Sequence, residues 1–253
     1  MSNSGHKVII AVDGPAASGK GTFAKGLAAR LGYAYLDTGS IYRMIAHEVL
    51  ERGGDPASVA DVMPVLKTLK YPLPETLLKN PDLRTPLVED ATPRVGAMPE
   101  AQAAVRAYQE EFVKNPPNNA AGAVLDGRDV GTSVFPNADV KFYITATAEE
   151  RARRRFAQQK DDNPGLTLDM VLKDINLRDQ RDMNRKSSPL RKADDAYLLD
   201  TTNDTPAEAL ERGVAVVKQK LAAQKPQTTI QKKPKPQQMP KPHFGAPQFK
   251  FGF

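Results

Sequence analysis

A glycine-rich segment near the N-terminus has the composition and spacing of a phosphate-binding loop. It spans residues 14–22, reads GPAASGKGT, and lies between an apolar run and a segment with helical periodicity. Glycines let the backbone curl so that successive N–H groups point inward, and the following helix adds the positive end of its dipole. Lys20 brings a full positive charge that can reach the β- and γ-phosphates of a nucleotide. Spacing, lysine and context together disfavour the alternative, a glycine turn that caps an ordinary strand–helix unit.

One position of the loop departs from the generic pattern. The residue after the lysine, usually Ser or Thr, is Gly21, so no hydroxyl stands there as a direct Mg²⁺ ligand. Lysine-glycine-threonine is typical of nucleotide and adenylate kinases, where water and phosphate supply much of the metal shell. The loop therefore favours small-molecule kinases over GTPases and motor-type ATPases. We expect ATP contacts from Gly14, Pro15, Ala16, Ala17, Ser18, Gly19, Lys20, Gly21 and Thr22.

A second group of polar residues follows the short apolar segment 33–36. Asp37, Thr38 and Gly39 come directly after it, and in open α/β sheets ligands bind at the carboxyl ends of strands. Arg43 lies about one helical turn further along, so its side chain can reach the same crevice. The alternative for Asp37 or Thr38 is capping of a helix N-terminus, a frequent use of both residue types.

A third group follows the apolar run 123–125. Asp126 ends this run and resembles the carboxylate that organises Mg²⁺ and its waters in phosphate-loop folds. Arg128 and Asp129 come next at the same strand end. The alternative for this adjacent arginine and aspartate is a surface ion pair, which contributes little to stability.

Two arginine-rich segments lie further along the chain. Arg178, Arg181 and Arg185 are three and four residues apart on one face of a predicted helix, and Asp182 lies one turn after Arg178. On periodicity alone, a solvated charged face with local ion pairs is the favoured interpretation. The run RARRR at 151–155 opens the preceding predicted helix. We expect most of these arginines to lie on the surface.

Alternating apolar and periodic segments predict the elements that position these residues. Strands are expected at 7–12, 33–36, 123–125, 140–144 and 197–199, and helices at 20–31, 40–52, 148–159, 168–185 and 206–223. Strands separated by helices favour a parallel sheet with right-handed crossovers. The fold class is therefore α/β, a five-stranded parallel sheet flanked by helices. Residues 53–117 break the alternation: the stretch is punctuated by prolines, and we interpret it as a small helical insertion between the second and third strands.

The formal net charge of +6 belongs to a C-terminal tail. Residues 225–253 contain six lysines and no acidic residue, and removing those six from the 36 basic residues leaves 30, equal to the number of acidic residues. The tail is rich in Pro, Gln and Lys and cannot bury enough apolar surface to offset its ordering entropy, so we expect it to be disordered. Its lysines would give at most weak, salt-sensitive contact with nucleic acid, and solvated disorder is the favoured interpretation.

The composition excludes other kinds of site. The absence of cysteine excludes disulfides and thiolate metal sites, and the three histidines, His6, His47 and His243, lack metal-ligand spacing. The apolar run 8–12 is too short for a signal sequence or a membrane span. We therefore expect a cytoplasmic protein with no membrane partner.

Four segments together resemble bacterial cytidylate kinases over most of residues 7–222. They are GPAASGKGT, LDTGSIYR at 36–43, DGRDVGT with the following VFPNA at 126–138, and RDQRDMNR at 178–185. Each is modestly specific, but four in this order and at these separations are strong. The resemblance implies a P-loop kinase core at 1–52 and 118–224, a nucleotide-binding insertion at 53–117 and a mobile lid at about 151–190. It also implies an ATP-dependent CMP or dCMP kinase that uses Mg²⁺ with ATP and is a monomer.

The resemblance assigns roles to the candidate residues. Asp37 and Thr38 would hold nucleotide groups, Arg43 the acceptor phosphate, and Asp182 the acceptor sugar. Asp129 would accept hydrogen bonds from the cytosine amino edge, which favours cytosine over uracil because uracil shows a carbonyl there. The implied catalytic set is Lys20, Arg128, Arg178 and Arg185. The implied acceptor-binding set is Asp37, Thr38, Arg43, Arg128, Asp129, Arg181, Asp182 and Arg185; Arg154 joins the loop in binding ATP, and Asp126 would hold Mg²⁺ through water.

Parts of the insertion depart from the family pattern. The pattern places a Ser before a Val-Ala run and an Arg after the Pro that follows, whereas this sequence has Pro93 and Gln102 there. Arg94 and Arg106 are close in sequence and are candidates to replace them. Residues 71–83 are too short and too proline-rich for the β-hairpin that the family often carries. We therefore expect weaker CMP affinity or broader acceptor tolerance.

Three alternatives differ from this prediction. The nearest is a nucleotide kinase that uses UMP, AMP or dTMP. Another is a non-catalytic P-loop nucleotide-binding protein, whose mark would be a missing lysine or a broken lid; yet Lys20, Arg128, Arg178 and Arg185 are all present. The third is a nucleic-acid binder that acts through the basic tail, which carries no RNA-recognition motif.

Overall fold

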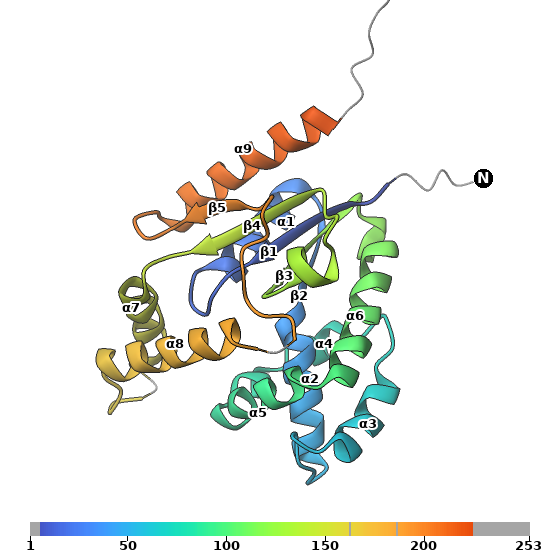
Figure 1. Ribbon diagram of the computed structural model, residues 1–253, viewed down its shortest axis with the longest axis vertical. Coiled ribbons are helices and arrows are strands. Elements are labelled where there is room, and N and C mark those ends of the chain that lie inside the picture. The colour runs from blue at the N-terminus through green and yellow to red at the C-terminus, as the bar shows by residue number, and fades with distance from the viewer. Residues whose placement is uncertain (1–5, 162, 186, 225–253) are drawn as a thin grey trace, which may run out of the picture.

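Five short apolar segments form one parallel sheet in the computed structural model, which describes residues 6–224 apart from 162 and 186 (Figure 1). The strands lie in the order β2-β3-β1-β4-β5. Their bounds are β1 Val8–Asp13, β2 Ala34–Asp37, β3 Gly122–Gly127, β4 Val140–Thr145 and β5 Tyr197–Asp200. The predicted fold class and strand positions are confirmed.

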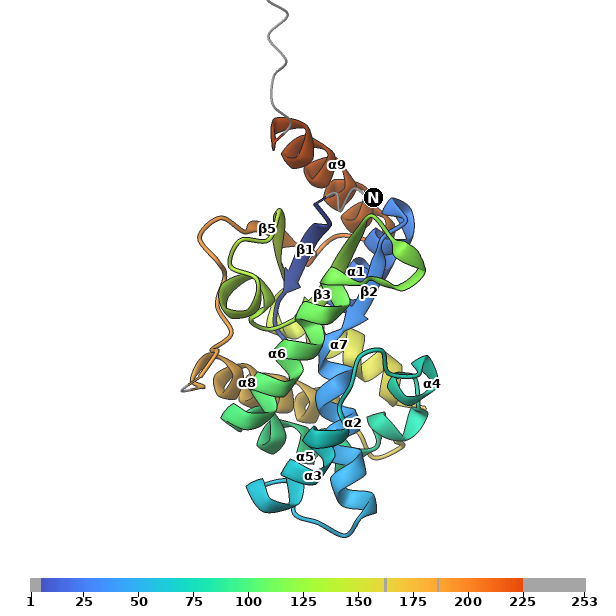
Figure 2. The same ribbon diagram turned by 90° about the vertical axis from the view of Figure 1, so that its right-hand side faces the viewer.

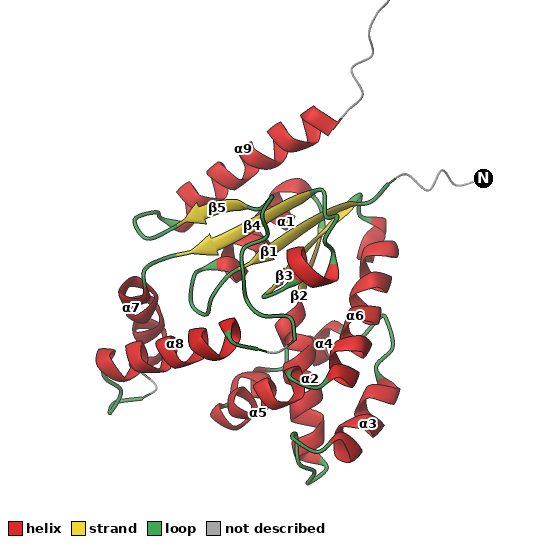
Figure 3. Cartoon of the chain, in the orientation of Figure 1, coloured by secondary structure: helices red, strands yellow, loops and turns green. Residues whose placement is uncertain are grey.

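Helices cover both faces of the sheet (Figure 3). The helices outside the insertion are α1 Lys20–Leu31, α2 Thr38–Glu51, α7 Ala148–Gln159, α8 Leu168–Met183 and α9 Pro206–Gln224, together with the short helical turn η3 Val130–Val134. The insertion holds α3 Val59–Thr68, α4 Glu75–Leu78, η1 Pro81–Arg84, α5 Pro86–Gly96 and α6 Pro99–Lys114, followed by η2 Pro117–Asn119. None of the described helices combines the length and apolar character needed to cross a bilayer.

Helices α1 and α9 cover one face of the sheet. Phe23 and Leu27 of α1 pack with Ile10, Val12 and Phe142 of the central strands in one buried cluster. The rings of Phe23 and Phe142 meet edge to face, with centroids 5.1 Å apart. Alternate residues of a strand point to opposite faces, so Ile10 and Val12 serve this cluster while Ala11 serves the other.

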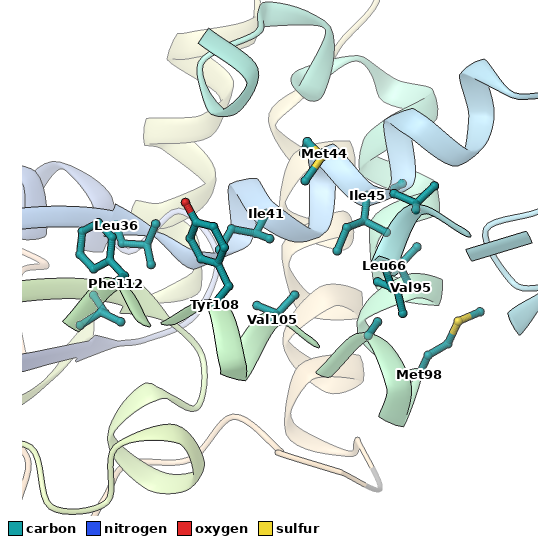
Figure 4. Close-up of a cluster of buried hydrophobic side chains, with 14 of the residues drawn as sticks. Leu36, Ile41, Met44, Ile45, Leu66, Val95, Met98, Val105, Tyr108 and Phe112 are labelled. Carbon is teal, nitrogen blue, oxygen red and sulfur yellow. The ribbon is translucent and has the colours of Figure 1, made fainter. Parts of the chain in front are cut away.

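A second cluster runs without a break from the opposite face of the sheet into the insertion. Leu36 and Leu125 of the sheet pack with Ile41 and Ile45 of α2 and with residues of α3, α5 and α6 (Figure 4). Figure 2 shows α3 and α5 beside the end of α2 that lies away from the sheet. The insertion therefore shares its hydrophobic core with the sheet.

Prolines place several helix starts in the insertion. Pro81, Pro86 and Pro99 each lie in the first turn of a helix, where the missing N–H costs nothing. The described residues 53–117 contain no strand, and residues 71–83 form α4 and most of η1 instead of a hairpin. The helical insertion without a hairpin is thus confirmed.

Helices α7 and α8 form a separate layer that we call the lid pair (Figure 1). Their buried contact is a cluster of Ala152, Val171 and Ile175, with Phe156 and Leu172 packed against it. Helix α8 ends at Met183, two residues before the predicted end, so Arg185 lies in the segment that follows the helix. The predicted disordered tail, 225–253, lies outside the described residues.

The contact between α1 and α9 depends on a glycine. A Cβ at Gly213 would lie 2.4 Å from two ring atoms of Phe23, whose side chain is buried. Alanine normally stabilises a helix by about 1 kcal/mol relative to glycine. Here the added methyl group has no space, so we expect Gly213→Ala to lower the free energy of unfolding by about 1–3 kcal/mol in urea denaturation. The double variant Gly213→Ala/Phe23→Leu should recover part of the loss, and a stabilised single variant would contradict this packing argument.

Candidate active site

A large cavity of about 2280 Å³ lies between the loop that follows β1, the insertion and the lid pair. A pocket for one drug-sized ligand typically holds about 300–1,000 Å³, so this cavity has space for two nucleotides. Predicted side chains from the loop, the strand ends and the lid pair line it together. They are Lys20, Thr22, Asp37, Thr38, Arg43, Asp126, Arg128, Asp129, Arg154, Arg178, Arg181, Asp182 and Arg185.

The phosphate loop is shaped by two glycines. A Cβ at Gly14 would lie 2.1 Å from the carbonyl oxygen of Ile144, so only glycine permits the loop to pass β4. Gly19 has a φ of 83°, in the left-handed region, and caps α1 at its N-terminus. Residues 16–22 line the cavity, whereas Gly14 and Pro15 lie buried outside its lining. The predicted ATP contacts thus gather at the cavity except for these two residues, which support the loop from behind.

Lys20 and Asp126 face each other at the centre of the sheet edge. The Lys20 Nζ lies 3.7 Å from Asp126 Oδ1, and both side chains are largely removed from solvent. Burial lowers the pKa of the Lys20 amine, and repulsion from Arg128 acts in the same direction. Burial likewise raises the pKa of the Asp126 carboxyl, against the attraction of Lys20. The charge of each group favours the charged form of the other.

Asp126 also meets the requirements of a magnesium ligand. Its Oδ1 is buried and accepts no hydrogen bond from the described residues, while Tyr35 donates to Oδ2 over 3.5 Å. The described residues contain no group of three or more His, Asp or Glu side chains that would cage a metal. Mg²⁺ usually keeps several waters and takes one or two carboxylates with substrate phosphates. A single buried carboxylate beside a phosphate loop fits this donor set.

Asp37 and Thr38 both have structural roles. The Asp37 side chain caps α2 by accepting from the Ser40 N–H, and it pairs with Arg43 at 2.6 Å. The buried Thr38 hydroxyl donates to the Asp126 carbonyl oxygen over 2.8 Å. The capping alternative is therefore confirmed for Asp37, although the residue also lines the cavity. Arg43 Nε is buried without a hydrogen-bond partner among the described residues, so the guanidinium keeps a donor for a ligand.

Arg128 pairs across the cavity with Asp182 of α8. Its Nε lies 2.9 Å from Asp182 Oδ2, and the other oxygen of Asp182 accepts from Arg185. The sequence alternative, a surface pair between Arg128 and Asp129, is wrong because the ion-pair partner of Arg128 comes from the lid pair. Asp182 thus holds two arginines, one from the strand end and one from the segment after α8.

Asp129 lies in a partly buried polar corner of the cavity. Burial raises the pKa of its carboxyl, and a hydrogen bond from Ser188 and the charges of Arg185 and Arg106 oppose that shift. Tyr42 lies in the same corner, where burial and the charge of Asp129 raise the pKa of its hydroxyl. The corner therefore presents a hydrogen-bond acceptor with nearby cations.

A family model described as cytidylate kinase matches residues 10–219. This match covers the sheet, the insertion and the lid pair. The chain belongs to the cytidylate kinase family.

Relatives of this family align over nearly their whole length. The cytidylate kinase of Granulibacter bethesdensis is 42% identical over 214 residues, which is 85% of this chain and 98% of the relative. That of Rhodospirillum rubrum is 42% identical over 213 residues, with 84% and 98% covered. That of Bradyrhizobium sp. is 45% identical over 196 residues, with 78% and 89% covered.

The arginine run of α7 differs from the surface role predicted for most of it. Arg151 is buried, donates to the carbonyl oxygen of Ala16 in the loop, and pairs with Asp179 of α8 at 2.7 Å. Arg155 pairs with Glu89 of the insertion. Three of the four arginines turn inward, toward carbonyl or carboxylate groups of Ala16, Asp179, Thr201 and Glu89. These partners lie in distant segments, so local spacing does not reveal them.

Arg154, the arginine predicted to contact ATP, lies beside the loop. Its guanidinium donates to the hydroxyl and carbonyl oxygens of Thr201 and pairs with Glu150 at 3.0 Å. A Cβ at Gly19 would lie 3.7 Å from its Nη1, which places the guanidinium directly against the phosphate loop.

The two departures from this kinase family's pattern lie at the cavity. Pro93 and Gln102 line it, and Gln102 donates to Gly96 O and accepts from Ser187, so its amide ties α6 to the segment after α8. Of the two candidate replacements, Arg106 lines the cavity beside Asp129. Arg94 instead pairs with Asp90 on the exposed side of α5.

Asp13 was missed by the sequence analysis. It ends β1, and its two oxygens accept from the backbone N–H groups of Val130 and Gly131 over 2.9 and 2.7 Å. These bonds fix the start of η3, directly after Arg128 and Asp129. The available signal was a carboxylate at the end of a buried strand, which needs donors from a neighbouring segment.

Asp13 predicts a pH-dependent stability. Burial and repulsion by Asp129 and Asp126 raise the pKa of its carboxyl from 3.8 to about 7. Between about pH 4 and pH 7 the native state holds a proton that the unfolded chain has released, so rising pH favours unfolding. The stability from this group is complete below about pH 4 and lost as pH rises through about 7.

Urea denaturation of the wild type and Asp13→Asn checks this sign. The wild-type free energy of unfolding minus that of the variant should fall by up to about 1.4 kcal/mol per pH unit between about pH 4 and pH 7, and then level off. A difference that stays constant or rises over this range would contradict the assignment.

Proposed function

We propose that this chain transfers the γ-phosphoryl group of ATP to CMP or dCMP inside the cavity between the phosphate loop and the insertion. As a member of the cytidylate kinase family, the chain is an ATP-dependent phosphotransferase. The observation that carries the proposal is the layout of the cavity. Lys20 and the loop line it together with the corner of Asp129 and Arg106 and with the arginines of the strand end and lid pair.

The ATP phosphates are assigned to the loop side. Backbone N–H groups of residues 16–22 and the N-terminus of α1 would bind the phosphate oxygens, and Lys20 would neutralise their charge. Arg154, already held against Gly19, would contact the same nucleotide. Asp126 is the residue that would hold hydrated Mg²⁺, which in such kinases neutralises the charge that develops on the phosphates.

The acceptor is assigned to the insertion side. Arg43 and Arg128 would bind its phosphate, with their present carboxylate partners Asp37 and Asp182 fixing their orientation. Asp182 and Arg181 would contact the acceptor near its sugar. Asp129 would accept a hydrogen bond from the amino group of cytosine, and Arg106 is close enough in the same corner to contribute a further donor.

The transfer itself needs alignment and charge stabilisation rather than a covalent intermediate. The acceptor oxygen is already an anionic phosphate oxygen, so no strong general base is required. Lys20, Arg128, Arg178 and Arg185 would spread the charge that develops on the transferring group. Closure of α7 and α8 would exclude water that otherwise hydrolyses ATP. We further propose that the protein acts as a cytoplasmic monomer.

A broader acceptor range is the second candidate. Pro93 and Gln102 stand where the family pattern has acceptor contacts, and the Gln102 amide is engaged with Gly96 and Ser187. UMP, AMP or dTMP would then also serve as acceptors.

An acceptor screen tests the reaction. ADP release with ATP and Mg²⁺ should be fastest with CMP or dCMP, slower with UMP, AMP and dTMP, and reduced by about 10³-fold or more in Lys20→Met, because no other cation occupies the loop. Comparable turnover with UMP or AMP would favour the broader range. No turnover with any acceptor would leave a nucleotide-binding protein.

Asp129→Asn tests the base contact. The amide can turn a donor toward the carbonyl of uracil, so kcat/KM for CMP should fall about 10- to 100-fold while that for UMP changes less. Steady-state kinetics with both acceptors give the ratio. An unchanged ratio of CMP to UMP would place the cytosine contact elsewhere.

A further inference from the structure

One carboxylate of the insertion reaches the lid pair. Glu89, in the first turn of α5, accepts from Arg155 Nη2 at both oxygens, over 3.1 and 2.9 Å. Its Oε2 also lies 3.7 Å from Arg178 Nη1 on α8. The three side chains line the cavity, and about a quarter to a third of each is exposed.

These contacts join the insertion to the lid pair, and the two make few other contacts with each other. Among the ion pairs of the described residues, those of Glu89 are the ones that link the insertion to α7 or α8. The lid pair has its own small buried cluster, separate from the core of the insertion. Hence Glu89 bears directly on whether α7 and α8 lie over the bound acceptor.

The two arginines are held differently. Arg155 is fixed by a close, charge-assisted hydrogen bond. Arg178 is attracted over a longer distance and makes no hydrogen bond to the described residues, so the donors of its guanidinium stay available for phosphate oxygens. One negative charge between two arginines also leaves a net positive charge facing the cavity.

We propose that Glu89 is a positioning residue: it holds Arg155 and Arg178 over the cavity and thereby ties the lid pair to the insertion that binds the acceptor. This inference rests on the proposed function. Arg155 stays paired with Glu89 throughout the reaction, whereas Arg178 turns its free donors to the transferring phosphoryl group. The alternative interpretation is that Glu89 forms an ordinary exposed ion pair, which would have little effect on activity or stability.

The chain offers a matched control on the same helix. Asp90 and Arg94 also form an ion pair, but both are exposed, and neither lines the cavity. The experiment therefore compares two double-mutant cycles, Glu89→Gln with Arg155→Gln and Asp90→Asn with Arg94→Gln, by steady-state kinetics with ATP and CMP.

In the first cycle, Glu89→Gln should lower kcat about tenfold with the KM for ATP within about twofold, because Arg178 is misplaced while the ATP loop is untouched. Arg155→Gln alone should also lower kcat several-fold, because Glu89 then loses the partner that fixes its carboxylate beside Arg178. The double variant should be little worse than Glu89→Gln, since both changes remove the same interaction. The second cycle should stay within about twofold of the wild type.

Urea denaturation of each variant separates positioning from folding. A kcat for Glu89→Gln within twofold of the wild type, additive losses in the first cycle, or a loss that merely follows the unfolded fraction would each overturn the role of Glu89. Wild-type turnover with CMP in the same assay keeps the two proposals apart. If the wild type is inactive, the proposed function fails; if it is active and the first cycle is additive, only the role of Glu89 fails.

Discussion

The pairing of Lys20 with Asp126 is the constraint on which the site depends. An isolated charge buried this deeply costs several kcal/mol, so the lysine and the carboxylate must lie opposite each other. The sheet ensures this, because β1 and β3 are adjacent and parallel, with Val12 beside Asp126, and the loop after β1 returns to the same edge. Register in the sheet thus sets the position of a charge in the cavity.

Five further arginines of the cavity are each paired with a carboxylate. Asp37 holds Arg43, Asp182 holds Arg128 and Arg185, and Glu89 holds Arg155 and Arg178. Each carboxylate orients guanidinium groups at the cavity, an arrangement that under the proposed function would reduce the reorganisation that phosphate binding requires. The carboxylates come from the end of β2, from α8 and from α5, so the charge pattern exists only when the sheet, the insertion and the lid pair are assembled.

Local patterns predicted the parts of the molecule that local sequence determines. The glycines and lysine of the loop, the strand ends at Asp37 and Asp126, and the helical insertion lie where the spacing placed them. The sequence predicts a surface position for Arg155, and this is wrong. Its partner Glu89 is 66 residues away, and no periodicity reveals a pairing over that distance. Asp13 was missed for the same reason, since its donors come from η3. For Arg178 and Asp182, periodicity favours a solvated face, and only the family resemblance predicts a place at the site.

The unequal division of the buried core has a consequence for how the protein opens. The insertion shares one continuous cluster with α2 and the sheet, whereas α7 and α8 meet over a small cluster in which three residues, Ala152, Val171 and Ile175, are buried. Local opening costs less where fewer apolar contacts are lost. We therefore expect amide protons of the lid pair to exchange with solvent through smaller opening motions than those of the insertion.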